Sequence, residues 1–226
     1  LKPDGVATFE FPHLLKMVQG NQFDTAYHEH YSYLSLTAVK RIFEANGLVV
    51  FDVQKLPTHG GSLRVFAQRR DYGAAAIASA VADLLSEEGT AGMTDVSFYQ
   101  AFQHKAEQVK DDLVAYLIDA KRQGLKVAGY GAAAKGNTLL NFAGVRPDSL
   151  PYVVDKNPAK CGKFLPGSKI PIVDESKIKA QEPDIIFILP WNIAPEIIKE
   201  LSYATDWGAS FIAPIPELRQ IKLKQI

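Results

Sequence analysis

The chain has 226 residues, and 25 lysines and arginines balance 25 aspartates and glutamates, so its formal net charge at pH 7 is zero. We therefore expect neither nucleic acid nor an acidic membrane surface as a partner, because proteins that bind them carry a basic patch. A composition of 47% hydrophobic and 22% charged residues excludes a disordered chain. The single cysteine, Cys161, excludes a disulfide framework and a cysteine-based zinc site within the chain.

Strand and helix patterns divide the chain into three sections. The first, residues 1–72, is predicted to hold three strands at 6–11, 48–54 and 63–69 and a helix at 37–45. The strand at 6–11 is predicted to be buried, and the other two favour an antiparallel pair. The second section, residues 73–123, is predicted to be a helical connector, with helices at 74–86 and 95–123 and a break at 87–92.

The third section, residues 124–226, alternates short apolar strands with helices. Strands are predicted at 126–130, 152–155, 185–189 and 211–213, and helices at 133–142, 175–180 and 194–201. Near-continuous apolar strands between helices are typical of a parallel sheet that is covered on both faces. The sequence therefore predicts an α/β protein whose third section is a Rossmann-like parallel-sheet domain.

A glycine-rich motif follows the first strand of this section. Gly129-Tyr130-Gly131-Ala132-Ala133-Ala134 matches the G-x-G-x-x-A fingerprint between a strand and a helix. The first glycine permits a tight turn, the second lets a phosphate approach, and the small Ala134 allows the helix to pack closely. The start of the helix offers N–H groups to an anion.

Polar residues around this motif extend the predicted site. Asp155 ends the next strand, where a ribose-binding carboxylate is expected. Lys135 offers a positive charge to a diphosphate, and Asn137, beyond Gly136, offers a hydrogen bond. The alternative is that the small residues only allow packing and that Asp155 is a strand-end turn residue. The motif does not identify the nucleotide.

A dense cluster of aromatic and polar residues spans positions 23–33. Tyr27, His28, Glu29 and His30 are its candidate functional residues, since histidine is the usual base near neutral pH and a carboxylate orients or polarises it. A metal site through His28 and His30 is disfavoured, because Ser32 stands where the second histidine of H-E-x-x-H would be. The alternative is a polar loop whose rings pack on the core.

Two further segments carry candidate binding residues. In the turn of His59, Gly60, Gly61, Ser62 and Arg64, the glycines permit a concave anion site and the guanidinium permits a bidentate contact. The alternative there is an ordinary hairpin turn.

Trp191 and Asn192 follow the strand at 185–189, at the edge where ligands of parallel sheets bind. Trp191 either stacks on a ligand ring or covers the core. Cys161 has no partner that would mark it as a nucleophile.

Together these motifs resemble the S-adenosylmethionine-dependent sugar C-methyltransferases, which modify nucleotide-linked keto-deoxysugars. The first section resembles the final strands and helix of a class I methyltransferase sheet, joined by long helices to the C-terminal Rossmann-like domain of that family. The motifs that carry the resemblance are Tyr27-His28-Glu29-His30, the turn from His59 to Arg64, and the run from Gly129 to Asn137.

The resemblance implies a fragment of a longer enzyme. The donor site for S-adenosylmethionine would lie mostly upstream, as would a zinc-binding part, and we expect the isolated chain to be inactive. His30 is the implied base, with Tyr27 and Glu29 beside it, although Tyr27 and His28 stay open for that role. The base would remove a proton next to the keto group, and the enolate carbon would attack the sulfonium methyl group. The loop from Gly129 to Asn137 would hold the diphosphate of the substrate.

Two other functions stay open at this point. One is an NAD(P)-dependent oxidoreductase built on the glycine motif and Asp155, and the other is a non-catalytic module that binds nucleotide sugars. No signal peptide or membrane-spanning run is visible, so we expect a cytoplasmic protein. The nucleotide base, the sugar, the methylated carbon and the oligomeric state are not predicted.

Overall fold

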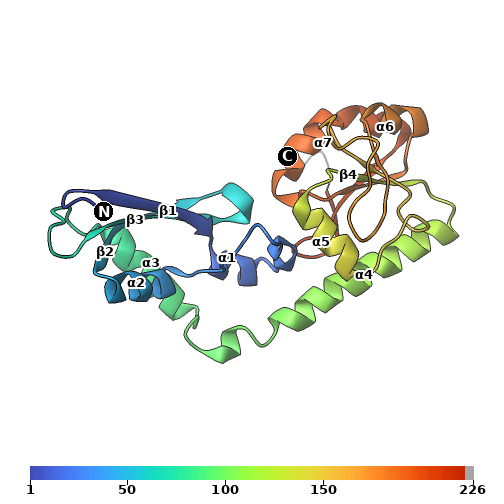
Figure 1. Cartoon of the computed structure of the whole chain (residues 1–226). Helices are drawn as coiled ribbons and strands as arrows, with labels where there is room; N and C mark the ends of the chain where they lie inside the picture. The colour runs from blue at the N-terminus through green and yellow to red at the C-terminus, as the bar shows by residue number, and fades with distance from the viewer. Residues whose placement is uncertain (222–226) are drawn as a thin grey trace. The chain divides into compact units, whose positions relative to one another are not determined.

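The computed structural model describes residues 1–221, which form two compact units (Figure 1). The first unit comprises Leu1–Phe23 and His28–Gln103, and the second comprises Asp24–Tyr27 and the chain from His104 onward. The short segment Asp24–Tyr27 thus packs with the second unit, although the residues on both sides of it pack with the first. The three-part domain division read from the sequence remains a prediction, and its residues 222–226 lie outside the described part.

The first unit contains a three-stranded antiparallel sheet in the order β1-β3-β2. Its strands are β1 (Val6–Pro12), β2 (Leu48–Leu56) and β3 (Ser62–Arg69), which confirms the three predicted strands and the antiparallel pair. β1 is an edge strand that pairs with β3, and Val6 and Phe9 are 53% and 42% exposed. The prediction of a buried strand is therefore wrong, because a run of apolar residues does not reveal how many neighbours a strand has.

Two helices cover this sheet. α2 (Leu36–Ala45) and α3 (Ser79–Thr90) pack on β2. Ser35 caps α2 by accepting a 3.1 Å hydrogen bond from the Ala38 N–H. The short helices α1 (Leu14–Gln19), η1 (Phe23–Thr25) and η2 (Thr58–Gly60) have no predicted counterpart. The shared core consists of Leu36, Val39, Val50, Val53, Leu63, Val65, Val81 and Leu84.

The helices of the second section start later than predicted. Residues 74–78 are not helical, because the Gln68 side chain binds both the N–H and the C=O of Ala75 at 2.9 and 2.8 Å. The predicted break at 87–92 is wrong as well, since α3 continues to Thr90. α4 (Phe102–Arg122) does not begin at position 95, where the Asp95 carboxylate instead caps the short helix η3 (Val96–Phe98).

The second unit is built on a six-stranded sheet in the order β6-β5-β4-β7-β8-β9. All neighbouring pairs are parallel except β8 and β9, so the predicted α/β class is confirmed. Two of these strands, β6 and β9, were not predicted from the sequence. The strands are β4 (Val127–Tyr130), β5 (Val153–Val154), β6 (Ile172–Val173), β7 (Ile185–Ile188), β8 (Ser210–Ala213) and β9 (Arg219–Ile221).

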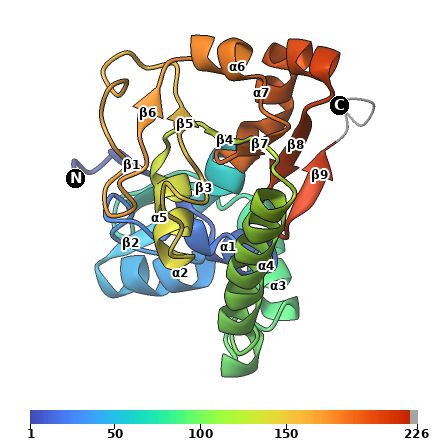
Figure 2. The ribbon, with the colours of Figure 1, turned by 90° about the vertical axis from the view of Figure 1, so that its right-hand side faces the viewer.

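Helices cover both faces of this sheet. α4 and α5 (Ala134–Phe142) lie on one face, and α6 (Ser176–Gln181) and α7 (Ala194–Glu200) lie on the other (Figures 1 and 2). The α5, α6 and α7 boundaries agree with the prediction to within one residue. Tyr116 of α4 packs edge-on against Phe187 of β7 with ring centroids 5.6 Å apart. Within residues 1–221, no helix combines the length and the apolar character needed to cross a bilayer.

One glycine sets how closely α5 approaches the sheet. A Cβ atom added at Gly136 would lie 2.7 Å from the Cβ of Leu189, just past the end of β7. Ala134, which was expected to provide this close approach, is exposed. That expectation is wrong because the helix starts only at Ala134, so the face that meets the sheet begins with Lys135 and Gly136.

We predict that Gly136→Ala destabilises the second unit by about 1–3 kcal/mol, because overpacking costs free energy of that order. Both tryptophans, Trp191 and Trp207, belong to the second unit, so their fluorescence in a urea titration reports its unfolding.

Gly89→Ala in α3 of the first unit is the matched control, and its unfolding is followed by far-ultraviolet circular dichroism because both tryptophans lie in the second unit. Nothing lies within 4 Å of a Cβ atom at Gly89, so the better helix former should cause no loss of stability there. Unchanged stability after both substitutions would contradict the tight contact at Gly136.

Candidate functional site

The glycine motif lies at the carboxyl end of β4. Gly131 has a φ of +89°, and a Cβ atom there would lie 2.5 Å from the Cδ of Pro190. A Cβ atom at Gly129 would lie 2.8 Å from Cγ2 of Val153 on the neighbouring strand. The two glycines therefore serve a left-handed turn and close packing between strands, and the turn leads the chain into α5.

Hydrogen bonds within the protein hold this turn in place. The Gly131 N–H donates to the Val154 carbonyl at 2.7 Å, and the Ala132 N–H donates to Asp155 Oδ2 at 2.8 Å. The ammonium of Lys160 lies 3.1 Å from the same carboxylate oxygen and 2.9 Å from the Ala132 carbonyl. Asp155 therefore anchors the turn, and its carboxylate is engaged by protein groups at the place where a ribose hydroxyl would need it.

The first turn of α5 presents the remaining N–H groups of the motif. The Asn137 N–H makes the first helical bond, to the Ala133 carbonyl at 3.0 Å. The N–H groups before it, on residues 134–136, are those that a helix start leaves for an anion. The Asn137 side chain faces Asn141, whose amide donates to its Oδ1 at 3.2 Å.

A buried lysine stands beside this helix start. Lys135 is 6% exposed, and its ammonium donates to Asn192 Oδ1 at 2.6 Å. The same ammonium lies 4.6 Å from the ring centre of Trp191, in a cation–π contact. The structure thus brings together three residues that the sequence placed at this edge of the sheet.

Asp24 completes the cluster, and sequence reasoning did not single it out. Its side chain is fully buried, and its Oδ2 accepts a hydrogen bond from the Trp191 indole N–H at 2.7 Å. The two residues are 167 positions apart, so no local pattern could have found the pair.

The cluster is electrostatically unusual because both of its charges are buried. Burial raises the pKa of the Asp24 carboxyl to about 6, although the Trp191 hydrogen bond and the Lys135 charge act in the opposite direction. Burial also lowers the pKa of the Lys135 ammonium, and Asp24 opposes that shift. A helix start adds its own partial positive charge next to the lysine. These features together make the start of α5 a candidate anion site.

The residues predicted to be catalytic lie in an irregular loop. Tyr27 packs with the second unit, whereas His28, Glu29 and His30 belong to the first. His28 and Glu29 are exposed, and His30 is half-buried. The rings of His30 and His59 are 5.7 Å apart in an edge-to-face arrangement. The first unit therefore joins two of the predicted motifs through His30 and His59.

The turn that carries His59 is a hairpin connection between β2 and β3. His59 has a φ of +56°, and the Gly61 N–H is bonded to the Thr58 carbonyl at 2.9 Å within the turn. The Gly60 carbonyl accepts from the Gln22 amide at 2.9 Å, and the buried Ser62 donates to the Thr58 carbonyl at 3.0 Å.

Arg64 lies on β3, beyond this turn. Its guanidinium makes two hydrogen bonds to Glu10 Oε2 on β1, at 2.9 and 3.2 Å. A carboxylate of the protein thus already engages the group expected to contact an anion.

A buried carboxylate fastens this turn and the tyrosine–histidine loop to one frame. Glu88 accepts hydrogen bonds from the N–H groups of Leu36 and Thr37 at 2.7 and 2.8 Å, and lies 2.8 Å from His13 Nε2. Burial works to raise the pKa of Glu88, but these hydrogen bonds lower it below its usual range. The backbone beside His13 binds both motifs, since the His13 and Leu14 N–H groups donate to the carbonyls of Gly61 and Leu34.

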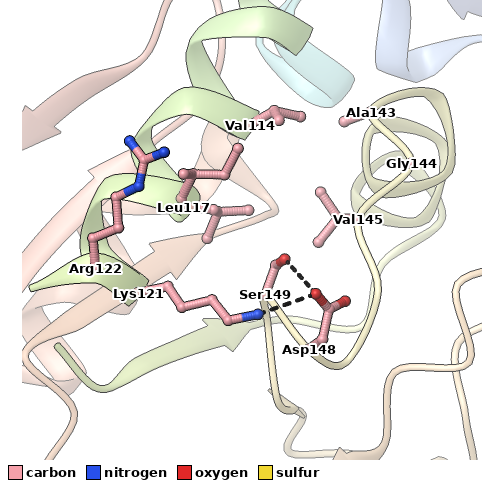
Figure 3. A pocket seen from close by; sticks show the side chains of 10 residues that line it. Val114, Leu117, Lys121, Arg122, Ala143, Gly144, Val145, Asp148 and Ser149 are labelled. Atoms are coloured by element: carbon pink, nitrogen blue, oxygen red, sulfur yellow. Dashed lines mark hydrogen bonds and ion pairs between the residues drawn. The ribbon is translucent and has the colours of Figure 1, made fainter. Parts of the chain in front are cut away.

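A separate groove of about 600 Å³ lies at the amino-terminal edge of the sheet in the second unit. Figure 3 shows it between α4 and the segment that follows α5, with Lys121 bonded to Asp148 at its rim. α5 runs away from the carboxyl ends of the strands, so the groove and the Lys135 cluster lie at opposite edges. Among residues 1–221, no group of three or more histidine, cysteine or acidic side chains could hold a metal ion.

Comparisons with known proteins relate the chain to C-methyltransferases. Residues 57–216 match a family model described as the C-methyltransferase C-terminal domain. Over 224 residues the chain is 40% identical to C-methyltransferase NovU of Streptomyces niveus, an alignment that covers 98% of this chain and 52% of that protein. The chain thus spans about half the length of the curated relative it matches.

We predict that Asp24 makes the stability of the protein depend on pH. Its folded-state pKa is raised from 3.8 to about 6, so its stabilising contribution is complete below about pH 4 and is lost as the pH rises to 6. Relative to Asp24→Asn, the wild type should lose about 3 kcal/mol of unfolding free energy over this range. Chemical denaturation of both proteins between pH 4 and 7 measures the difference.

Asp95→Asn is the control with the opposite sign. The Ser97 hydrogen bonds lower the pKa of the exposed Asp95, so the wild type should gain stability relative to this variant as the pH rises through the carboxylate range. A constant difference between wild type and Asp24→Asn would show that Asp24 titrates normally.

Proposed function

Because the chain belongs to the C-methyltransferase C-terminal domain family, we propose that it is the C-terminal part of an S-adenosylmethionine-dependent C-methyltransferase acting on a nucleotide-linked keto sugar. In this proposal the start of α5 and Lys135 bind the diphosphate of the substrate. His30 is the base that removes a proton from the carbon next to the keto group.

The burial of Lys135 is the observation that supports a substrate with a diphosphate group. A lysine is almost never fully buried without a partner, and a positive charge at a helix start is unfavourable. An anion that contacts the N–H groups of residues 134–136 would offset both costs. A diphosphate suits this position, because it supplies several acceptor oxygens and negative charge at one place.

The carbon chemistry needs a base and a hydrogen-bond donor. A neutral imidazole at His30 can accept the proton that the keto group acidifies. The Tyr27 hydroxyl can donate a hydrogen bond to the enolate oxygen that forms, and Glu29 can orient the imidazole. The edge-to-face contact of the half-buried His30 with the His59 ring limits the positions that its imidazole can take.

S-adenosylmethionine, when bound, supplies an electrophilic methyl group. The glycine turn at 129–133 does not fit this cofactor, because Ala132 and Lys160 already engage the Asp155 carboxylate that its ribose would require. The same contacts count against a redox dinucleotide at this turn. We therefore assign the turn to the substrate.

For the base, we predict that His30→Asn in the full-length enzyme lowers kcat by about 10²–10⁴-fold with little change in KM, as general bases contribute that much. Steady-state methyl transfer to a nucleotide-linked keto sugar measures both constants. His28→Asn is the informative comparison, because the adjacent histidine is exposed.

The exposed His104 of α4 provides the control, and His104→Asn should leave turnover unchanged. Near-normal turnover of His30→Asn would remove that residue as the base. A large loss confined to His28→Asn would transfer the role to His28.

For the anion site, we predict that Lys135→Met weakens the binding of a thymidine- or uridine-diphosphate sugar at least about tenfold, since a hydrogen bond to a charged group contributes about 1.5–3 kcal/mol. Isothermal titration of this chain measures the dissociation constant.

Lys121→Met is the matched control, because Lys121 lines the groove at the opposite edge of the sheet. A loss of affinity in Lys121→Met, with none in Lys135→Met, would move the ligand to that groove. Equal affinity in all three proteins would refute the assignment of the diphosphate to α5.

A further inference from the structure

We propose that Asp24 is a determinant of anion binding at the Lys135 site. In the free protein Asp24 is the counter-ion of Lys135. When the diphosphate of a substrate binds and becomes the counter-ion instead, Asp24 takes up a proton from the solvent. This inference rests on the proposed function, because it assumes that the anion bound there is the diphosphate of a nucleotide sugar. All residues involved belong to the second unit.

The geometry links the two charges through one indole ring. The Trp191 N–H donates to Asp24 Oδ2 at 2.7 Å, while the Lys135 ammonium lies over the ring of the same residue, 4.6 Å from its centre. Asp24 Oδ1 is fully buried and has no hydrogen-bond partner among the described residues. One oxygen of the carboxylate is thus held in place, and the other is left in an environment that favours a proton.

No direct ion pair closes this cluster. Within residues 1–221, no ion pair joins Asp24 to Lys135, and the lysine donates to the neutral Asn192 instead. The charge of Lys135 works to lower the pKa of Asp24, and the charge of Asp24 works to raise the pKa of Lys135. Without direct contact, the two charges attract each other more weakly than a contact ion pair would. The ammonium can therefore still bind an anion that contacts it directly.

A bound diphosphate would change the proton affinity of Asp24 in one direction. The negative charge at the α5 start would compensate the Lys135 charge and would also repel the Asp24 carboxylate. Both effects favour the neutral carboxyl group. Since the pKa of Asp24 is about 6 in the free protein, the group is mostly ionised at pH 7. Binding at this pH should therefore draw a proton from the solvent.

Calorimetry tests this directly with thymidine-diphosphate glucose as the probe. Its diphosphate is esterified at both ends and has no group that titrates near pH 6, so any proton taken up from the solvent on binding goes to the protein. The titration is run at pH 7 in two buffers that differ in ionisation enthalpy. We expect uptake of close to one proton per ligand, and a dissociation constant that rises by up to tenfold per pH unit between pH 6 and 8.

Asp24→Asn is the matched variant, because its side-chain carbonyl can still accept the Trp191 hydrogen bond while carrying no charge. We expect it to bind the probe without proton uptake and with a dissociation constant that no longer depends on pH. Asp24→Ser serves the same purpose if the circular dichroism of Asp24→Asn shows that it does not fold.

The outcomes separate this inference from the proposed function. Tight binding by the wild type without proton uptake would overturn the role of Asp24 and leave the diphosphate site in place. Equal uptake in wild type and Asp24→Asn would assign the proton to another group and overturn it as well. Failure of the wild type to bind either thymidine- or uridine-diphosphate glucose would instead refute the proposed diphosphate site itself, and the inference with it.

Discussion

The burial of one lysine at the start of a helix is the constraint on which the candidate site depends. Lys135 is almost fully buried in the first turn of α5, where the helix itself carries a partial positive charge. Three partners of different kinds reduce the free-energy cost of burying this ammonium. They are the amide oxygen of Asn192, the ring face of Trp191 and the more distant charge of Asp24. None of the three places a full negative charge in direct contact with the ammonium. This is expected of a site that binds an anion.

Close backbone packing makes this arrangement possible. Gly131 leaves room for Pro190, and Gly136 leaves room for Leu189, so the segment after β7 lies directly against the start of α5. That contact places Trp191 and Asn192 beside Lys135. A side chain at either glycine would force the two segments apart and lengthen the contacts between Lys135 and its partners. Glycines of a nucleotide-binding fingerprint here serve contacts within the protein as well as the approach of a ligand.

The first unit relies on a buried carboxylate in a comparable way. Glu88 binds the start of α2 and lies against His13, and the backbone beside His13 holds the turn at Gly61 and the end of the loop at Leu34. A network in which the carboxylate receives several hydrogen bonds is stable in a low-dielectric interior, whereas a partly satisfied one is not. This frame brings the ring of His30 to that of His59, although the two motifs are far apart in the chain.

The sequence by itself determined the α/β class, most strands, and the boundaries of the helices after position 130, because apolar periodicity and glycine turns act locally. It also placed Lys135, Trp191 and Asn192 at one sheet edge, since carboxyl ends of parallel strands meet there. Only the tertiary structure decided that β1 is an exposed edge, that Gly136 rather than Ala134 packs on the sheet, and that Asp155 binds Lys160. Asp24 was beyond prediction for the same physical reason: its role arises from contacts with Trp191 and Lys135 that folding creates between distant positions, and no local pattern encodes them.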